Sequence, residues 1–248
     1  MRIAVAGASG RVGGFAVEAL QREGHEVVAI SRSAGVDAYT GEGLDAALAG
    51  VDAVIDSTNT SAFDEAEIVD FFGTTSRNLL AAGQRAGVRH HVLLSIVGID
   101  RGHHTAHYAG KLEQERLVTS SPIPWSIVRA TQFHDFAAMV AGWSEHDGVA
   151  PIAPLLIQPV EIADVGEVLA EVAAGPPLND RLDLAGPRTE ALVDMARRTL
   201  AARGQQLELV PTWRGIFDAS MAGEAMLPGE GARIAATSFD DWLAAGAK

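Results

Sequence analysis

Three glycines near the amino terminus constrain the fold of this chain most strongly. They lie in Gly7-Ala8-Ser9-Gly10-Arg11-Val12-Gly13, between a short β-rich run, Ile3 to Ala6, and a stretch with apolar helical spacing, Val12 to Arg22. A glycine turn between a strand and a helix is typical of the first βαβ unit of a dinucleotide-binding fold. Gly7 permits the tight turn, Gly10 lets the backbone approach a pyrophosphate, and Gly13 allows close packing of the helix on the strand. Unpaired N–H groups at the start of the helix then predict an anion site.

The residues after the second strand indicate which dinucleotide is preferred. An NAD-selective site places an acid there for the ribose hydroxyls, whereas this chain has Ser31-Arg32-Ser33 and no acid until Asp37. Arg32 can pair with a 2′-phosphate, although a solvated loop charge is the alternative interpretation. We therefore expect NADP(H), with NAD(H) less favoured. The cofactor contacts expected from the turn and from the ends of the next two strands are Gly7, Ser9, Gly10, Arg11, Val12, Gly13, Ser31, Arg32, Ser33, Ser57 and Thr58.

Strand and helix patterns alternate along the rest of the chain. Predicted strands are Glu26 to Ile30, Val51 to Asp56, His91 to Val97, Trp125 to Val128 and Leu182 to Leu184. Predicted helices are Leu44 to Leu48, Asp64 to Ala86, Tyr108 to Thr119, Ile162 to Ala174 and Glu190 to Arg203. This alternation predicts an α/β fold: a doubly wound parallel sheet, or Rossmann fold, in one domain over residues 1–248. Residues of about 130–160 and 204–231 are expected to form a small substrate lobe.

Composition excludes several classes of function. The chain has 19 Lys and Arg against 32 Asp and Glu, a net charge of −13, and such a field repels nucleic acid. The absence of cysteine removes disulfides and thiolate metal sites and suits a cytoplasmic location. No targeting segment is visible, and no stretch approaches the roughly 20 apolar residues of a membrane span. We expect a small-molecule substrate, no nucleic-acid or membrane partner, and a monomer or homodimer.

The chain resembles the atypical short-chain dehydrogenases, in the NmrA-like NAD(P)-binding branch that includes quinone-reductase-like proteins. The resemblance covers about nine-tenths of the chain. It implies the same α/β fold, NAD(P) binding and oxidoreductase activity, with Thr131 passing the nicotinamide. The segments that carry it are Ile3 to Gly10, Leu48 to Asp56, Val92 to Gly98, Lys111 to Glu115, Trp125 to Phe133 and Phe239 to Leu243.

The catalytic group that the resemblance implies is incomplete in this sequence. Ser95 matches the family serine, and Lys111 matches the lysine that would face the nicotinamide ribose. The residue four before that lysine is His107 instead of tyrosine, and Tyr108 stands three before it, rotated by about 100° on a helix. His107 could donate a proton, Tyr108 could reach in, or neither acts and the acceptor takes its proton from solvent. We favour the third reading, and a solvated helix lysine is the alternative interpretation of Lys111.

Aromatic residues after the fifth predicted strand suggest a substrate pocket. Phe133 and Phe136, with Trp213 from the late lobe, would form an apolar wall, and Gln158 would be a polar anchor. Helical spacing of the aromatics is equally compatible with a core position. His103, His104 and His107 raise the question of a metal, but no further ligands complete a set, so we expect none.

These observations predict an NADPH-dependent oxidoreductase that transfers hydride to a small, apolar, planar carbonyl or quinone-like compound. Two alternatives remain open. One is a non-catalytic NADP-sensing regulator of the NmrA type, which the missing tyrosine favours. The other is an isomerase or epimerase that holds its cofactor tightly.

Overall fold

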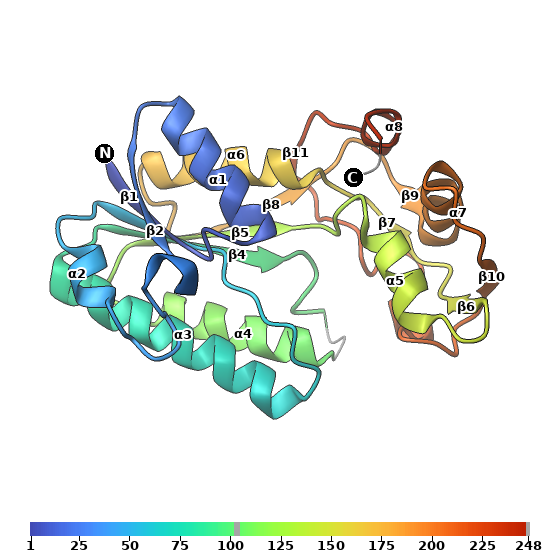
Figure 1. Ribbon diagram of the computed structural model, residues 1–248, viewed down its shortest axis with the longest axis horizontal. Coiled ribbons are helices and arrows are strands. Elements are labelled where there is room, and N and C mark those ends of the chain that lie inside the picture. The colour runs from blue at the N-terminus through green and yellow to red at the C-terminus, as the bar shows by residue number, and fades with distance from the viewer. Residues whose placement is uncertain (102–104, 247–248) are drawn as a thin grey trace. The chain divides into compact units, whose positions relative to one another are not determined.

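The computed structural model describes residues 1–101 and 105–246. Within them, a seven-stranded sheet has the order β11-β8-β5-β4-β3-β1-β2 (Figure 1). β1 pairs in parallel with both β2 and β3, β4 is parallel to β3, and β11 is parallel to β8. The strands of the sheet are β1 (Arg2–Ala6), β2 (Glu26–Ile30), β3 (Ala53–Asp56), β4 (His90–Ile96), β5 (Trp125–Ala130), β8 (Arg181–Ala185) and β11 (Arg233–Ile234). The predicted doubly wound, Rossmann-type α/β fold is confirmed.

Helices cover both faces of the sheet. α1 and α6 pack against each other on one face, and α2, α3 and α4 lie on the other (Figure 1). The α1–α6 contact is close because a Cβ atom at Gly166 would lie 2.5 Å from Cβ of Phe15. The α-helices are α1 (Arg11–Arg22), α2 (Leu44–Leu48), α3 (Glu65–Ala86), α4 (Ala106–Thr119), α5 (Phe136–Ser144), α6 (Ile162–Ala174), α7 (Leu192–Ala202) and α8 (Phe239–Ala244). None of the helices described is long and apolar enough to cross a membrane.

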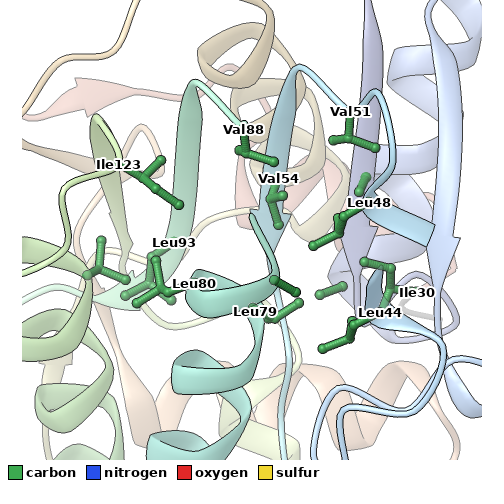
Figure 2. Close-up of a cluster of buried hydrophobic side chains, with 14 of the residues drawn as sticks. Ile30, Leu44, Leu48, Val51, Val54, Leu79, Leu80, Val88, Leu93 and Ile123 are labelled. Carbon is green, nitrogen blue, oxygen red and sulfur yellow. The ribbon is translucent and has the colours of Figure 1, made fainter. Parts of the chain in front are cut away.

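A core of aliphatic side chains fills the space between the sheet and the helices α2 and α3 (Figure 2). The sheet contributes apolar residues that lie on one face of adjacent strands, and the helices contribute residues at i, i+3 and i+4 spacing. Burial of such side chains is the main favourable term in folding. The residues labelled in Figure 2 are Ile30, Leu44, Leu48, Val51, Val54, Leu79, Leu80, Val88, Leu93 and Ile123.

The chain divides into two compact units. The first consists of Met1–Arg129 and Ile162–Leu182, and the second of Ala130–Glu161 and Asp183–Lys248. The second unit contains both segments that the sequence assigned to a substrate lobe. Its two small sheets pair β6 (Val149–Ile152) with β10 (Glu208–Pro211) and β7 (Leu156–Ile157) with β9 (Glu190–Ala191).

One sequence-based boundary in the second unit is wrong, and two short elements there were not predicted. The helix expected from Glu190 begins at Leu192, because Glu190 and Ala191 pair in an antiparallel ladder with β7. The region 204–231, which lacks periodicity, contains β10 and a short 3-10 helix, η2 (Ala219–Met221). Pairing partners distant in sequence stabilise such short strands, so local pattern does not reveal them.

Candidate functional site: a dinucleotide cradle

The glycine turn forms a tightly bonded loop between β1 and α1. Gly7 has a φ of 80°, in the left-handed region that favours glycine. Its N–H donates to the carbonyl of Ile30 over 3.0 Å, and its own carbonyl accepts from the N–H of Gly10 over 2.8 Å. The turn is therefore attached both to itself and to the end of β2.

Gly13 and Ser57 pack closely against the turn, and together with Gly7 to Gly10 they form what we call the glycine cradle. A Cβ atom at Gly13 would lie 2.1 Å from the carbonyl oxygen of Gly7, and one at Gly7 would lie 2.9 Å from the carbonyl oxygen of Ser57. Both approaches are too close for any residue larger than glycine. The roles predicted for Gly7 and Gly13 thus have a steric counterpart in the structure.

The first turn of α1 suits an anionic group. No side chain caps the helix at Gly10, and its first turn contains no acid. The first backbone N–H groups of a helix have no partner within the helix, and the helix dipole adds positive potential there. Ser9, Gly10 and Arg11 are exposed, whereas Val12 is buried and so contributes packing. This donor set fits the pyrophosphate of a dinucleotide.

The segment after β2 presents Arg32 at the same edge of the sheet. Ser31 accepts a hydrogen bond from the N–H of Ala34 over 3.3 Å, which begins the short 3-10 helix η1 (Arg32–Ala34). The hydroxyls of Ser31 and Ser33 lie 3.0 Å apart. Arg32 is exposed, and no ion pair holds it among residues 1–101 and 105–246. Its guanidinium is therefore available to a phosphate.

The first acid after β2 is Asp37, and its carboxylate is hydrogen-bonded within its own turn. Its carboxylate accepts from the backbone N–H of Tyr39 over 2.8 Å and from that of Thr40 over 3.3 Å. A carboxylate used in this way does not replace the acid of an NAD-selective site. The local arrangement thus supports the preference for a 2′-phosphate.

The residues after β3 are held mainly by the protein itself. Both the N–H and the hydroxyl of Ser57 donate to the carbonyl of Ala6, over 3.0 and 2.8 Å. The N–H and hydroxyl of Thr58 both donate to Oδ1 of Asp56, over 3.0 and 2.6 Å. Ser57 therefore shapes the cradle through its backbone, and Thr58 fixes the loop that follows.

Lys111 is an anchored residue of the interior, which excludes the reading of a solvated lysine. Its ammonium donates to the carbonyls of Leu94 and Thr58 over 3.1 and 3.3 Å, and to Oε1 of Gln114 over 2.8 Å. It also lies 4.5 Å from the ring centre of Phe72. Because an ammonium has three donors, these acceptors use all of them. Burial lowers the pKa of Lys111 to about 8, against the opposing charges of Asp56 and Glu115.

A buried polar network continues from this lysine. Nε2 of Gln114 donates to Oδ2 of Asp56 over 3.1 Å and to the hydroxyl of Ser76 over 3.0 Å. The network joins the end of β3 to α3 and α4. Gln114 and Asp56 were not among the predicted site residues, although Gln114 lies three residues after Lys111 and hence on the same helix face.

The side chain of Ser95 belongs to a second buried polar cluster. Its hydroxyl donates to Oε1 of Glu115 over 2.6 Å. Arg129 donates to the same carboxylate through Nε and Nη2, over 2.9 and 2.7 Å, and to Asp100 over 2.9 Å. Burial raises the pKa of Glu115, but the hydrogen bonds from Arg129 and Ser95 outweigh it and keep the pKa below its usual range. Glu115 was also missed, and its i+4 spacing from Lys111 was the available signal.

Burial shifts the pKa values of both candidate proton donors at the start of α4, His107 and Tyr108. The ring of His107 packs edge-on against Phe72 at 5.3 Å, and burial lowers its pKa to about 4. Burial raises the pKa of Tyr108 to about 12. At neutral pH, His107 is thus neutral, and the Tyr108 phenol is a weaker acid than in water.

The candidate pocket residues lie in the second unit. The ring centre of Phe136 lies 6.3 Å from that of Trp143 and 6.0 Å from that of Phe217. Phe133 forms a bridge with Val160 and its carbonyl accepts from the N–H of Phe136 over 3.0 Å, and Trp213 is half-buried. Nε2 of Gln158, the predicted polar anchor, donates to the carbonyl of Gly186 over 2.7 Å.

Across the described part of the chain, no group of three or more His, Asp or Glu side chains could hold a metal ion. His103 and His104 lie outside the described residues. His107 packs on an aromatic ring.

Comparison with known proteins is consistent with the cradle. A family model described as NAD(P)H-binding matches residues 7–176. None of the curated proteins matches this chain.

Solved structures share the fold at low sequence identity. Triphenylmethane reductase of Citrobacter sp., complexed with NADP(H), is 19% identical with a TM-score of 0.65, over 86% of this chain and 79% of that chain. An NADPH-dependent quinone oxidoreductase of Escherichia coli is 21% identical with a TM-score of 0.66, over 85% and 78%. A short-chain dehydrogenase/reductase superfamily protein of Agrobacterium tumefaciens with bound NAD is 17% identical with a TM-score of 0.72, over 100% and 96%.

Proposed function

Because the chain belongs to the NAD(P)H-binding family, we propose that it is an NADPH-dependent oxidoreductase that reduces a small, planar, apolar carbonyl or quinone-like compound. The observation that carries this proposal is the glycine cradle, with an uncapped helix N-terminus and Arg32 at the end of the neighbouring strand. A bound NADPH would supply the hydride. The solved structures of similar fold include reductases of quinones and of triphenylmethane dyes, which supports an extended, planar acceptor.

The residues of this chain then have separable roles. Backbone N–H groups at Arg11 to Gly13 hold the pyrophosphate, and Arg32 holds the 2′-phosphate. Lys111 ties the loop at Thr58 to β4. Because His107 is neutral and Tyr108 is a weak acid, the acceptor takes its proton from solvent. A quinone, whose reduced form is stabilised by aromaticity, suits such a site better than a simple aldehyde.

One observation favours a second candidate, a non-catalytic NADP-sensing regulator. Ser95 and Lys111, which match the family's serine and lysine, are 2% and 5% exposed and have their hydrogen-bond donors satisfied within the protein. A protein that only binds the cofactor would not need them at the reacting atoms.

Oxidation of NADPH, followed by its absorbance, distinguishes the two candidates. We expect turnover with naphthoquinones and benzoquinones and much slower turnover with aliphatic aldehydes. NADPH binding is measured in parallel by calorimetry. Tight binding with no turnover across the whole panel would overturn the reductase in favour of the regulator.

A further inference from the structure

The carboxylate of Asp56, at the end of β3, is fully buried and accepts hydrogen bonds from the loop that follows it and from α4. Its Oδ1 accepts from the N–H and the hydroxyl of Thr58 over 3.0 and 2.6 Å, and its Oδ2 accepts from Nε2 of Gln114 over 3.1 Å. We propose that Asp56 is a positioning residue for the dinucleotide, which sets the loop after β3 against the glycine cradle. The inference rests on the proposed function and deepens it by identifying what determines the affinity of the cofactor site.

The hydrogen bonds through Gln114 run in one direction, from a cation to an anion. The ammonium of Lys111 donates to Oε1 of Gln114 over 2.8 Å, and Nε2 of the same amide donates to Asp56. An ammonium only donates and a carboxylate only accepts, so the two charges fix which way the amide points. Gln114 is fully buried, and neither bond can be exchanged for one to bulk water.

His91 is the second basic residue near Asp56, and it does not supply the balancing charge. It lies on β4, where it pairs with Val54 of β3, and it is buried. Burial lowers the pKa of His91 below its usual value, although the charge of Asp56 opposes that shift, so His91 is neutral at neutral pH. Lys111, with a pKa lowered only to about 8, keeps its proton there. The cation at the other end of the chain of bonds is therefore Lys111.

The loop after β3 is attached to both charges. The carbonyl of Thr58 accepts from the ammonium of Lys111 over 3.3 Å, whereas its N–H and hydroxyl donate to Asp56. Every polar group of Thr58 is thus bonded to one end or the other of the chain through Gln114. A change in the charge or the direction of this chain will move the Thr58 backbone.

Ser57, the residue before Thr58, packs directly against the glycine turn. A Cβ atom at Gly7 would lie 2.9 Å from the carbonyl oxygen of Ser57, and one at Gly13 would lie 2.8 Å from its hydroxyl oxygen. Packing at these distances leaves no free space, so a displaced Ser57 displaces the turn. The contact lies between β3 and β1, where the strand order reverses and where a dinucleotide crosses the carboxyl ends of the strands.

Two substitutions that transpose the charge test this chain of bonds. In Asp56→Asn, the new amide keeps an acceptor for Thr58 but presents its NH₂ group to the NH₂ group of Gln114. Turning the Gln114 amide over would only move the conflict to Lys111. In Gln114→Glu, two carboxylates face each other instead. We expect each single substitution to weaken NADPH binding to the full chain about tenfold, measured by calorimetry.

The double variant Asp56→Asn/Gln114→Glu restores a complete chain of bonds. The asparagine oxygen still accepts from Thr58, its NH₂ group donates to the new glutamate, and that glutamate accepts from Lys111. The net charge is the same as in the wild type. Because the two changes compensate each other, the double variant should bind NADPH within about threefold of the wild type.

A control in the same unit separates positioning from folding. Leu79→Ala removes a fully buried side chain of α3 that belongs to the aliphatic core and takes no part in the network. It should lower the unfolding temperature at least as much as either single substitution, because it leaves a cavity. Measured well below that temperature, its NADPH affinity should equal that of the wild type.

Thr58→Val provides a milder variant of nearly the same shape, for the case that a single substitution at the buried charges does not fold. It removes the hydroxyl that donates to Asp56 and leaves Lys111 and Gln114 in place. We expect NADPH binding to weaken about threefold, since the N–H of Thr58 still donates to Asp56.

Four results would overturn the positioning role and leave the proposed function standing. They are wild-type affinity for NADPH in Asp56→Asn, wild-type affinity in Thr58→Val, a loss of about 100-fold in the double variant, as for independent effects, and an equal loss in Leu79→Ala and Asp56→Asn. Failure of the wild type itself to bind NADPH would overturn both the positioning role and the proposed function.

Discussion

The hydroxyl of Ser95 donates to the carboxylate of Glu115 over 2.6 Å, at a point where both side chains are buried. The same carboxylate receives two further bonds from Arg129. The serine that matches the family's carbonyl-orienting residue is therefore part of an ion cluster between β4, α4 and β5. The hydroxyl of Ser95 is thus engaged by the protein itself.

The first prediction concerns Ser95 itself. We expect Ser95→Ala to lower the free energy of unfolding by about 2 kcal/mol, since a hydrogen bond to a charged group is lost. Turnover of NADPH with a quinone should stay within about threefold, because the hydroxyl makes no contact specific to the transition state. Chemical denaturation and steady-state kinetics on the same preparations measure both. A large fall in kcat with unchanged stability would restore Ser95 as a catalytic residue.

The second prediction uses two adjacent glycines of α1. Gly13→Ala should weaken NADPH binding by about 100-fold or more, equivalent to about 2.7 kcal/mol, because its Cβ atom would lie 2.1 Å from the Gly7 carbonyl oxygen. Gly14→Ala is the matched control, since the nearest atom to its Cβ would be 3.9 Å away. Alanine is also the better helix former, so Gly14→Ala should raise stability by up to about 1 kcal/mol. Calorimetry and thermal unfolding report both; similar behaviour of the two variants would contradict the cradle geometry.

The third prediction concerns the choice between NADP and NAD. Arg32→Glu should weaken NADPH binding by about 50-fold, or about 2.3 kcal/mol, through loss of the phosphate contact and repulsion by the new carboxylate. NADH binding should be unchanged or improved. Arg197→Glu makes the same charge change at an exposed arginine of α7 and should alter neither affinity. If the ratio of NADPH affinity to NADH affinity were unchanged in Arg32→Glu, Arg32 would not be the residue that binds the 2′-phosphate.

The fourth prediction is a dependence of stability on pH that originates at His107. Burial lowers its pKa from 6.5 to about 4. Between pH 6.5 and pH 4, His107 is therefore protonated in the unfolded chain and neutral in the folded chain. The free energy of unfolding should therefore fall as the pH drops from 6.5 towards 4, by at most about 3 kcal/mol from this residue. His107→Phe keeps the ring contact with Phe72 and should show a shallower decline between those limits. Denaturant unfolding at a series of pH values measures it, and parallel curves for the two proteins would assign the dependence elsewhere.

Strong local signals made much of the first unit predictable. Asp64 caps α3 by accepting from the N–H of Glu67 over 3.0 Å, and Gly87 ends that helix in the left-handed conformation, as the amphipathic pattern between them indicates. The second unit was less predictable because β6, β7, β9 and β10 are short and depend on partners distant in sequence. Phe136 and Phe217 likewise meet only through the fold.

The sequence by itself determined the parallel α/β fold and the glycine turn before α1, and it predicts a phosphate at Arg32. These features depend on residues within a few positions of one another, whose backbone requirements and charges are readable along the chain. Only the tertiary structure decided which hydrogen bonds Ser95 and Lys111 make. Those bonds depend on which acceptors other elements bring within about 3 Å: Glu115 of α4 for Ser95 of β4, and the Leu94 carbonyl of β4 for Lys111 of α4. A hydrogen bond is decided by distance and direction in space, and those are properties of the packed fold.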